Sequence, residues 1–168
     1  MLRRRIRGFS LLELAVVVAA LSVLLTVFLD RLTYYQEAVE RAKFEATLQT
    51  YKTALQIHLA ELMLERREGE ARSLEVENPT HWLSEKPANY AGDYPARPQP
   101  GYWYFDGAAR ELVYVVNSGR QLALNADQGL KQLRFRVRII YQPIAVAGAQ
   151  VLGIGGVALA PTINYRWS

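Results

Sequence analysis

Gly8-Phe9-Ser10-Leu11-Leu12-Glu13-Leu14 opens the stretch of sequence that decides the fold of this chain. A run of apolar residues continues from it to Leu29 and contains one carboxylate, that of Glu13. A charge at the centre of a membrane-spanning helix costs about 2.5–3.5 kcal/mol on insertion scales. Glu13 lies nearer the end of the run, so the cost is smaller but not zero, and the acid requires a specific explanation.

The composition narrows the class of protein. The chain has 168 residues and no cysteine, which excludes disulfides, cysteine-ligated zinc and a cysteine nucleophile. Four of its 20 basic residues are arginines within the first eight positions, and without them the basic residues equal the 16 acidic residues in number. The net charge of +4 therefore comes from the N-terminal leader, and it does not indicate a nucleic-acid-binding surface.

Three interpretations of the N-terminal segment compete. Phe9–Leu29 is long enough to cross ~30 Å of hydrocarbon as a helix, and the preceding arginines favour a cytoplasmic N-terminus. The first interpretation is a secretory signal removed after its apolar core, the second an uncleaved anchor, and the third a leader cut between Gly8 and Phe9. Val18–Ala20 and Ala19–Leu21 are poor secretory cleavage sites, and the apolar run continues past them, which disfavours the first.

Gly8-Phe9-Ser10-Leu11-Leu12-Glu13 resembles the prepilin-type signal of type IV pilins and type II secretion pseudopilins. In that family a membrane-embedded prepilin peptidase cuts after the glycine and methylates the new N-terminal residue, and an acid follows five residues into the mature chain. The resemblance implies that Gly8 is the cleavage residue, Phe9 the methylated terminus and Glu13 the family acid. It covers residues 1 to about 30, and the remainder of the chain is similar only in general layout.

Charge pairing would give Glu13 a physical role in such a protein. After cleavage Phe9 carries an ammonium group, which the Glu13 carboxylate of a neighbouring subunit can neutralise. Each charge offsets much of the desolvation of the other, and the pair fixes the axial register of the two subunits. The alternative is that Glu13 lies near the membrane interface and is hydrated locally, which leaves the adjacent glycine and basic leader unexplained.

One long helix is predicted from Phe9 to Arg67, because neither proline nor glycine occurs between Asp30 and Glu68. Gly69 provides its stop. Its second half carries an apolar stripe at spacings of three and four, formed by Phe44, Leu48, Tyr51, Leu55, Leu59 and Leu62. Many major pilins have a proline near the position of Val27–Arg31, and its absence here favours a minor subunit.

The predicted fold is α+β, with a small antiparallel β-sheet head packed on the helix stripe. We expect a cleaved leader (1–8), a transmembrane or filament-core helix (9–29), its amphipathic continuation (30–72), a proline-rich linker (73–100) and the head (101–168). Within the linker, Thr80–Leu83 is predicted to form a helical turn, and Trp82 and Tyr90 are expected to attach the linker to the head.

The head is predicted to contain three to five strands. Two aromatic and β-branched runs around Asp106-Gly107 are typical of a hairpin. Alternation over Leu133–Tyr141 predicts a half-buried strand. Val151–Ala160 is a further strand segment, interrupted by three glycines, and the chain closes with Ile163–Trp167.

Arg134, Arg136 and Arg138 form a basic row on one face of the predicted strand. The favoured interpretation is a solvated face or ion pairs with neighbouring subunits. Contact with nucleic acid is the alternative, and it is disfavoured because no exposed aromatic platform accompanies the row.

We predict no catalytic site, no cofactor and no metal. The two histidines, His58 and His81, belong to no cluster of ligands, and Asp93, Asp106 and Asp127 lack the dense spacing of a calcium loop. The glycines of Gly153–Gly156 lack the spacing and context of a dinucleotide-binding fingerprint.

The resemblance therefore implies a structural subunit of a filament anchored in the bacterial inner membrane, with its head in the periplasm. Its expected partners are other pilin or pseudopilin subunits, the prepilin peptidase and an inner-membrane assembly platform. One alternative is a tip subunit whose head contacts a secreted substrate, a surface or DNA. A membrane-tethered enzyme is a third possibility, disfavoured because no motif selects catalytic residues. The choice between a type IV pilus and type II secretion stays open.

Overall fold

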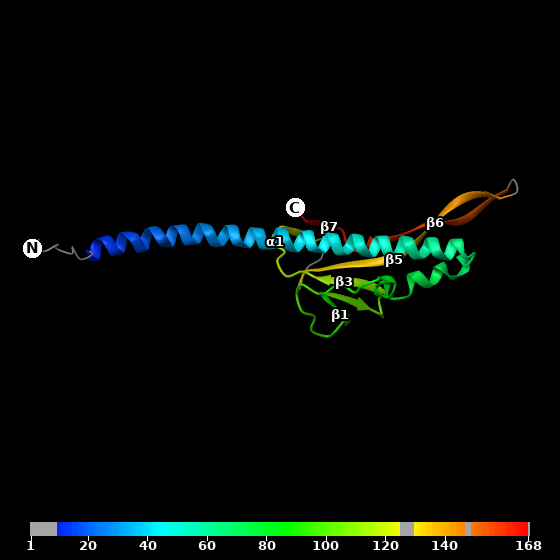
Figure 1. Ribbon diagram of the computed structural model, residues 1–168, viewed down its shortest axis with the longest axis horizontal. Coiled ribbons are helices and arrows are strands. Elements are labelled where there is room, and N and C mark those ends of the chain that lie inside the picture. Colours follow the sequence, from blue (N-terminus) through cyan, green and yellow to red (C-terminus); the bar gives the residue numbers. More distant parts are fainter. Residues whose placement is uncertain (1–9, 125–129, 147–148, 168) are drawn as a thin grey trace, which may run out of the picture. The chain divides into compact units, whose positions relative to one another are not determined.

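A computed structural model describes residues 10–124, 130–146 and 149–167. These residues form one long helix, α1 (Leu11–Leu64), two short 3₁₀ helices and seven strands (Figure 1). The chain divides into two compact units, with the boundary between Val39 and Glu40. The predicted α+β class, with a long N-terminal helix and a small β-sheet, is confirmed.

Helix α1 ends earlier than the glycine at position 69 predicts. Arg66 adopts a left-handed conformation with φ of 58°. The Arg67 amide donates to the Leu62 carbonyl at 2.8 Å, and the Arg66 amide donates to the Met63 carbonyl at 3.2 Å. These two bonds form a Schellman motif, which satisfies carbonyls at the helix end. An arginine takes the position that glycine usually occupies, so the predicted end at Arg67 is wrong by three residues.

The main sheet has five strands in the order β1-β2-β3-β5-β6. Its members are β1 (Tyr90–Asp93), β2 (Trp103–Asp106), β3 (Glu111–Val115), β5 (Gln132–Val146) and β6 (Ala149–Pro161). The predicted hairpin at Asp106-Gly107 is confirmed as β2 and β3, and the predicted strands 133–141 and 151–160 are confirmed within β5 and β6.

Two features of the sheets depart from the sequence prediction. Strand β1 lies within the segment expected to be a linker, and it pairs parallel to β2. A second, two-stranded sheet joins β4 (Leu122–Leu124) to β7 (Tyr165–Trp167). Short strands of three and four residues give too little periodicity to be recognised in sequence.

The segment between α1 and β1 packs on the helix through two 3₁₀ helices, η1 (Glu68–Glu75) and η2 (Pro79–Trp82). The Asn78 side chain caps η2 by accepting from the Thr80 amide at 3.0 Å. Thr80 is buried, and its hydroxyl lies 3.1 Å from the Tyr51 hydroxyl of α1. Burial raises the pKa of Tyr51 well above its ordinary value. The predicted turn at 80–83 is confirmed, as are the core contacts of Trp82 and Tyr90.

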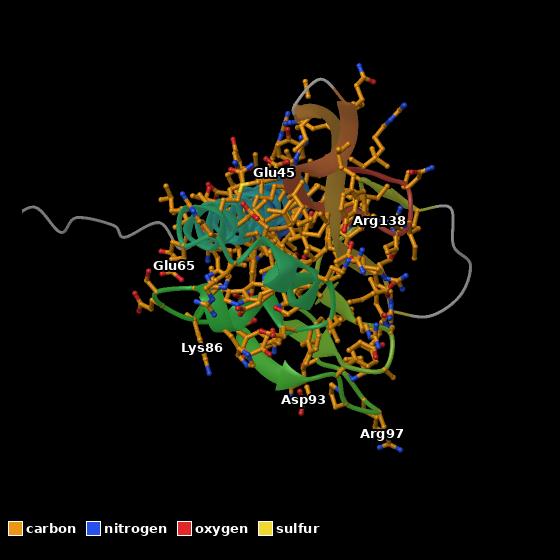
Figure 2. All side chains as sticks on the ribbon, turned by 90° about the vertical axis from the view of Figure 1, so that its right-hand side faces the viewer. Glu45, Glu65, Lys86, Asp93, Arg97 and Arg138 are labelled. Carbon is orange, nitrogen blue, oxygen red and sulfur yellow. The ribbon has the colours of Figure 1, made fainter. Side chains whose placement is uncertain are left out.

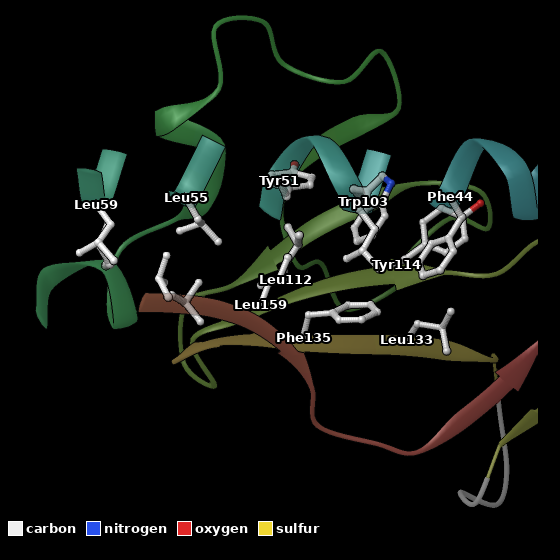
Figure 3. Close-up of a cluster of buried hydrophobic side chains, with 14 of the residues drawn as sticks. Phe44, Tyr51, Leu55, Leu59, Trp103, Leu112, Tyr114, Leu133, Phe135 and Leu159 are labelled. Carbon is white, nitrogen blue, oxygen red and sulfur yellow. The ribbon is translucent and has the colours of Figure 1, made fainter. Parts of the chain in front are cut away.

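The core lies between the helix stripe and one face of the main sheet (Figure 3). All six predicted stripe residues, from Phe44 to Leu62, are buried. The Phe44 ring stacks on Trp103 with ring centroids 5.4 Å apart, and it also contacts Tyr114, Phe135 and Trp167. Aromatic pairs of this kind contribute about 0.5–1.5 kcal/mol beyond the area they bury, so Phe44 is the centre of the contact between helix and sheet.

Candidate assembly site

Glu13 lies in the first turn of α1. Helical hydrogen bonding begins at Ser10, whose carbonyl accepts from the Leu14 amide at 3.0 Å. A carboxylate in a first turn interacts favourably with the positive end of the helix dipole. The Glu13 side chain is exposed, and it makes no hydrogen bond or ion pair within the residues that the structure describes. Gly8 and Phe9, the predicted processing residues, lie outside the described residues.

The helix that follows Glu13 is apolar and fully exposed. Every residue from Leu11 to Leu29 is exposed, and the most apolar 18-residue window of α1 has a mean hydropathy of 2.6 and no buried residues. The helix is therefore long and apolar enough to cross a membrane. A chain folded in water does not leave such a surface uncovered, so this segment requires a membrane or a bundle of other helices.

The two hydroxyl side chains within the apolar segment are satisfied by the helix itself. Ser22 Oγ donates to the Val18 carbonyl at 2.8 Å, and Thr26 Oγ1 donates to the Ser22 carbonyl at 2.9 Å. These bonds leave neither hydroxyl donor unpaired in an apolar surrounding. Glu13 is thus the one side chain between Leu11 and Leu29 whose polar atoms need a partner from outside the helix.

A second glutamate of α1, Glu40, forms hydrogen bonds with the end of β3 and with the loop that follows it. Glu40 Oε1 accepts from the Tyr114 hydroxyl at 2.9 Å and from the Asn117 amide at 2.7 Å, and Oε2 accepts from the Ser118 amide at 2.6 Å. Burial and the negative charge of Glu40 raise the pKa of Tyr114. No sequence pattern identified this contact, because its partners are 74 to 78 residues away.

The three arginines of the basic row have different surroundings. Arg134 Nη1 lies 3.1 Å from a carboxylate oxygen of Asp106 and 3.1 Å from one of Glu111, and Arg136 Nη2 lies 2.9 Å from the other Glu111 oxygen. Arg134 also lies over the Tyr94 ring, 5.2 Å from its centroid. A hydrogen bond from the Ala109 amide, followed by those from Arg134, holds the pKa of Asp106 below its usual value.

Arg138 completes the row but has no ion pair among the described residues, and its side chain is exposed (Figure 2). Arg134 and Arg136 are paired within their own chain rather than offered to a neighbour. The charge that the row presents to a partner therefore comes chiefly from Arg138. Contact between this row and a partner stays a prediction.

The remaining candidates form no reactive constellation in the described part of the chain. His58 hydrogen-bonds to Glu61 at 3.2 Å and stacks on Trp82, and no group of three or more acidic, histidine or cysteine side chains is placed to hold a metal ion. An open groove with a cavity volume of about 970 Å³ runs between α1 and the segment 82–88. Small side chains, including those of Ala46, Thr50 and Ala54, line its helical wall.

Comparison with known proteins identifies the N-terminal segment. Residues 3–29 match the prokaryotic N-terminal methylation motif, the signal of type IV pilins and pseudopilins. Neither the curated proteins nor the solved structures give a match to the chain. The match includes Gly8, Phe9 and Glu13 and ends where the apolar run ends. It supports a pilin-like structural subunit rather than an enzyme, and it supports anchoring in a membrane.

Proposed function

We propose that this chain is a subunit of a type IV filament, either a minor pilin or a pseudopilin, anchored in the bacterial inner membrane before assembly. The observation that carries the proposal is one exposed acid, Glu13, at the start of an exposed apolar helix within the methylation motif. The prepilin peptidase removes residues 1–8 and methylates Phe9. The head then faces the periplasm, since the leader arginines keep the N-terminus in the cytoplasm.

Assembly joins the N-terminus of one subunit to the Glu13 carboxylate of a neighbour. The ammonium group on Phe9 supplies the positive charge, and the apolar residues up to Leu29 supply the packing surface. A charge-assisted hydrogen bond contributes about 1.5–3 kcal/mol. Each subunit both gives an N-terminus and receives one, so the contact is of the head-to-tail kind that extends into filaments.

The lack of a proline near Asp30 supports assignment to a minor subunit. Helix α1 continues through this position without a break, whereas a proline would remove a helical hydrogen bond and let the helix bend. The Thr33 hydroxyl donates to the Asp30 carbonyl at 2.8 Å, which adds to the hydrogen bonding of this turn.

Processing and assembly are tested separately. Mass spectrometry of the protein from cells with prepilin peptidase should find a chain that begins at a methylated Phe9. Glu13→Ala should be cleaved normally but enter sheared filaments roughly 10-fold to 100-fold less, the factor for a loss of ~1.5–3 kcal/mol. Asp30→Ala, which removes another exposed acid of α1 outside the motif, is the matched control and should assemble normally. An intact Met1 would refute the proposal, and normal incorporation of Glu13→Ala would refute the pairing.

A further inference from the structure

The β5–β6 hairpin continues well past the rest of its sheet. Strand β3 pairs with β5 only as far as Phe135, whereas β5 and β6 remain paired from Phe135–Pro161 to Val146–Ala149. The far ends of the two strands, Ile140–Val146 of β5 and Ala149–Gly156 of β6, form a two-stranded ribbon. This ribbon extends beyond the other strands of the head (Figure 1).

The ribbon carries no charge and exposes apolar side chains on both faces. No acidic, basic or histidine residue occurs between Ile139 and Ala160. Five large apolar side chains are 40–71% exposed: Ile140, Tyr141, Ile144, Val151 and Leu152. A two-stranded ribbon is only marginally stable in water without further packing. This ribbon therefore requires a covering that the single chain does not provide.

The free edge of β5 is protected against the addition of another strand. The Ile139 amide points away from β6 and donates to Glu75 Oε1 at 2.8 Å. Amides alternate in direction along a strand, so the amides of Tyr141 and Ala145 also face this edge, and position 143 between them is a proline. Proline has no amide hydrogen to offer, and it is one of the devices that prevent strand addition at an edge. Two of the four edge positions from Ile139 to Ala145 thus offer no donor.

The free edge of β6 has no such protection. Because the Ile139 amide points away from β6, its cross-strand partner Val157 also directs its backbone groups outward. A bulge at Gly155 shifts the register by one residue, and the same argument then applies to the partners of Tyr141, Pro143 and Ala145. The residues whose backbone amide and carbonyl point away from β5 are Gln150, Leu152, Ile154, Val157 and Leu159, whereas the side chains of Val157 and Leu159 are buried in the core. No hydrogen bond from their amides to a group outside the hairpin occurs among the described residues, and β6 is the last strand of its sheet.

We propose that the β6 edge is a docking site for an extended, uncharged, β-branched strand of another protein, which adds to the sheet beside β6. An edge of outward amides and carbonyls matches the backbone of an extended strand, and this mode of recognition is β-augmentation. The ribbon then becomes three-stranded. The absence of charge from Ile139 to Ala160 selects against a charged strand, which would lose hydration without gaining an ion pair.

A different protein fits this edge better than a lipid or a second copy. Insertion into lipid would leave the outward amides and carbonyls unsatisfied, at several kcal/mol each. Two copies that joined their β6 edges antiparallel would form a closed two-fold pair. A closed pair does not extend into a filament, so this preference rests on the proposed function. The hydrogen-bonding argument for a strand does not depend on it.

The experiment uses the full chain in lipid nanodiscs and a fluorescein-labelled peptide with a seven-residue Val/Thr core and a lysine at each end. The control is the same peptide with alternate core residues N-methylated, which removes donors from one edge and leaves the side chains in place. We expect saturable binding of the first peptide, measured by fluorescence polarisation, and at least tenfold weaker binding of the methylated one. Leu152→Pro, which removes one outward amide of β6, should weaken binding at least tenfold, whereas Leu152→Ala should change it less than threefold.

Equal binding of the two peptides would overturn the proposal, because apolar contact alone would then explain the affinity. Absence of binding would overturn it as well. A second copy is tested with nanodiscs that hold two chains, each carrying Gln150→Cys. A disulfide between the two chains would show that their β6 edges pair with each other, and it would assign the edge to a second copy instead. The wild-type comparison of two peptides does not depend on a variant that folds, and none of these results depends on cleavage at Gly8 or on Glu13, so a failure here is distinct from a failure of the filament proposal.

Discussion

Replacing Glu40 with alanine should destabilise the head far more than an average surface substitution. The change removes the acceptor of three hydrogen bonds, those from Tyr114, Asn117 and Ser118. Hydrogen bonds to charged groups contribute about 1.5–3 kcal/mol each, but water can replace the carboxylate at the exposed Asn117 amide. The Tyr114 residue is only 3% exposed, so its hydroxyl loses its partner without full hydration. We therefore expect a loss of about 2–4 kcal/mol, less than three full bonds.

Urea unfolding of the full chain in detergent measures this loss, with tryptophan fluorescence as the signal because Trp103 is fully buried in the core. Glu45→Ala is the matched control, since the ion pair of this glutamate among the described residues is with the half-exposed Arg41 of the same helix. Such an i,i+4 pair contributes about 0.3–0.5 kcal/mol. A double-mutant cycle with Tyr114→Phe should give a coupling energy of about 1–2 kcal/mol. Equal losses for Glu40→Ala and Glu45→Ala, or a coupling energy of zero, would refute the reasoning.

Two further predictions concern the core and the outer face of the sheet. Phe44→Ala should cost about 3–5 kcal/mol of unfolding free energy and Phe44→Leu less than about 2, measured by the same urea titration; similar costs would show that the ring contacts of Phe44 add little. Because the pKa of Asp106 is lowered in the folded chain, its stabilisation is present above the unfolded pKa of about 4 and is lost as the pH falls through the folded value. Asp106→Asn should therefore be less stable at pH 7 and lose less stability than wild type below pH 4, and parallel curves would contradict this assignment.

The sequence predicted those parts of the molecule that depend on short-range patterns. The basic leader, the glycine before Phe9 and the apolar run lie together in about 30 residues, so their meaning does not depend on folding. The helix stripe from Phe44 to Leu62 repeats every three to four residues, and every member is buried as expected. The end of α1 was less predictable, because a left-handed Arg66 takes a role that the sequence suggested for Gly69.

Contacts between distant segments could not be predicted, because no local pattern encodes them. Alternation predicts that Arg134, Arg136 and Arg138 lie on one face of a strand, and the structure confirms the strand as part of β5. Whether they are neutralised depends on the register of β5 against β3, which brings Arg134 opposite Val113 and places the carboxylate of Glu111 within reach. Glu40 is a similar case, since a glutamate on a mixed helix face gives no sign of three donors 74 to 78 residues away.

The distribution of charge gives the two exposed apolar surfaces a common explanation. The head neutralises its buried charges internally, as Glu111 does with Arg134 and Arg136. Two stretches instead lack charge altogether, namely Leu14–Leu29 in α1, which is exposed throughout, and Ile139–Ala160 in the hairpin, which exposes five large apolar side chains between Ile140 and Leu152. A membrane or a helix bundle satisfies the first, because every backbone group there is already bonded within the helix. The second retains open backbone groups along β6, which lipid cannot satisfy, so an added strand is the covering that meets both its apolar side chains and its hydrogen-bonding edge.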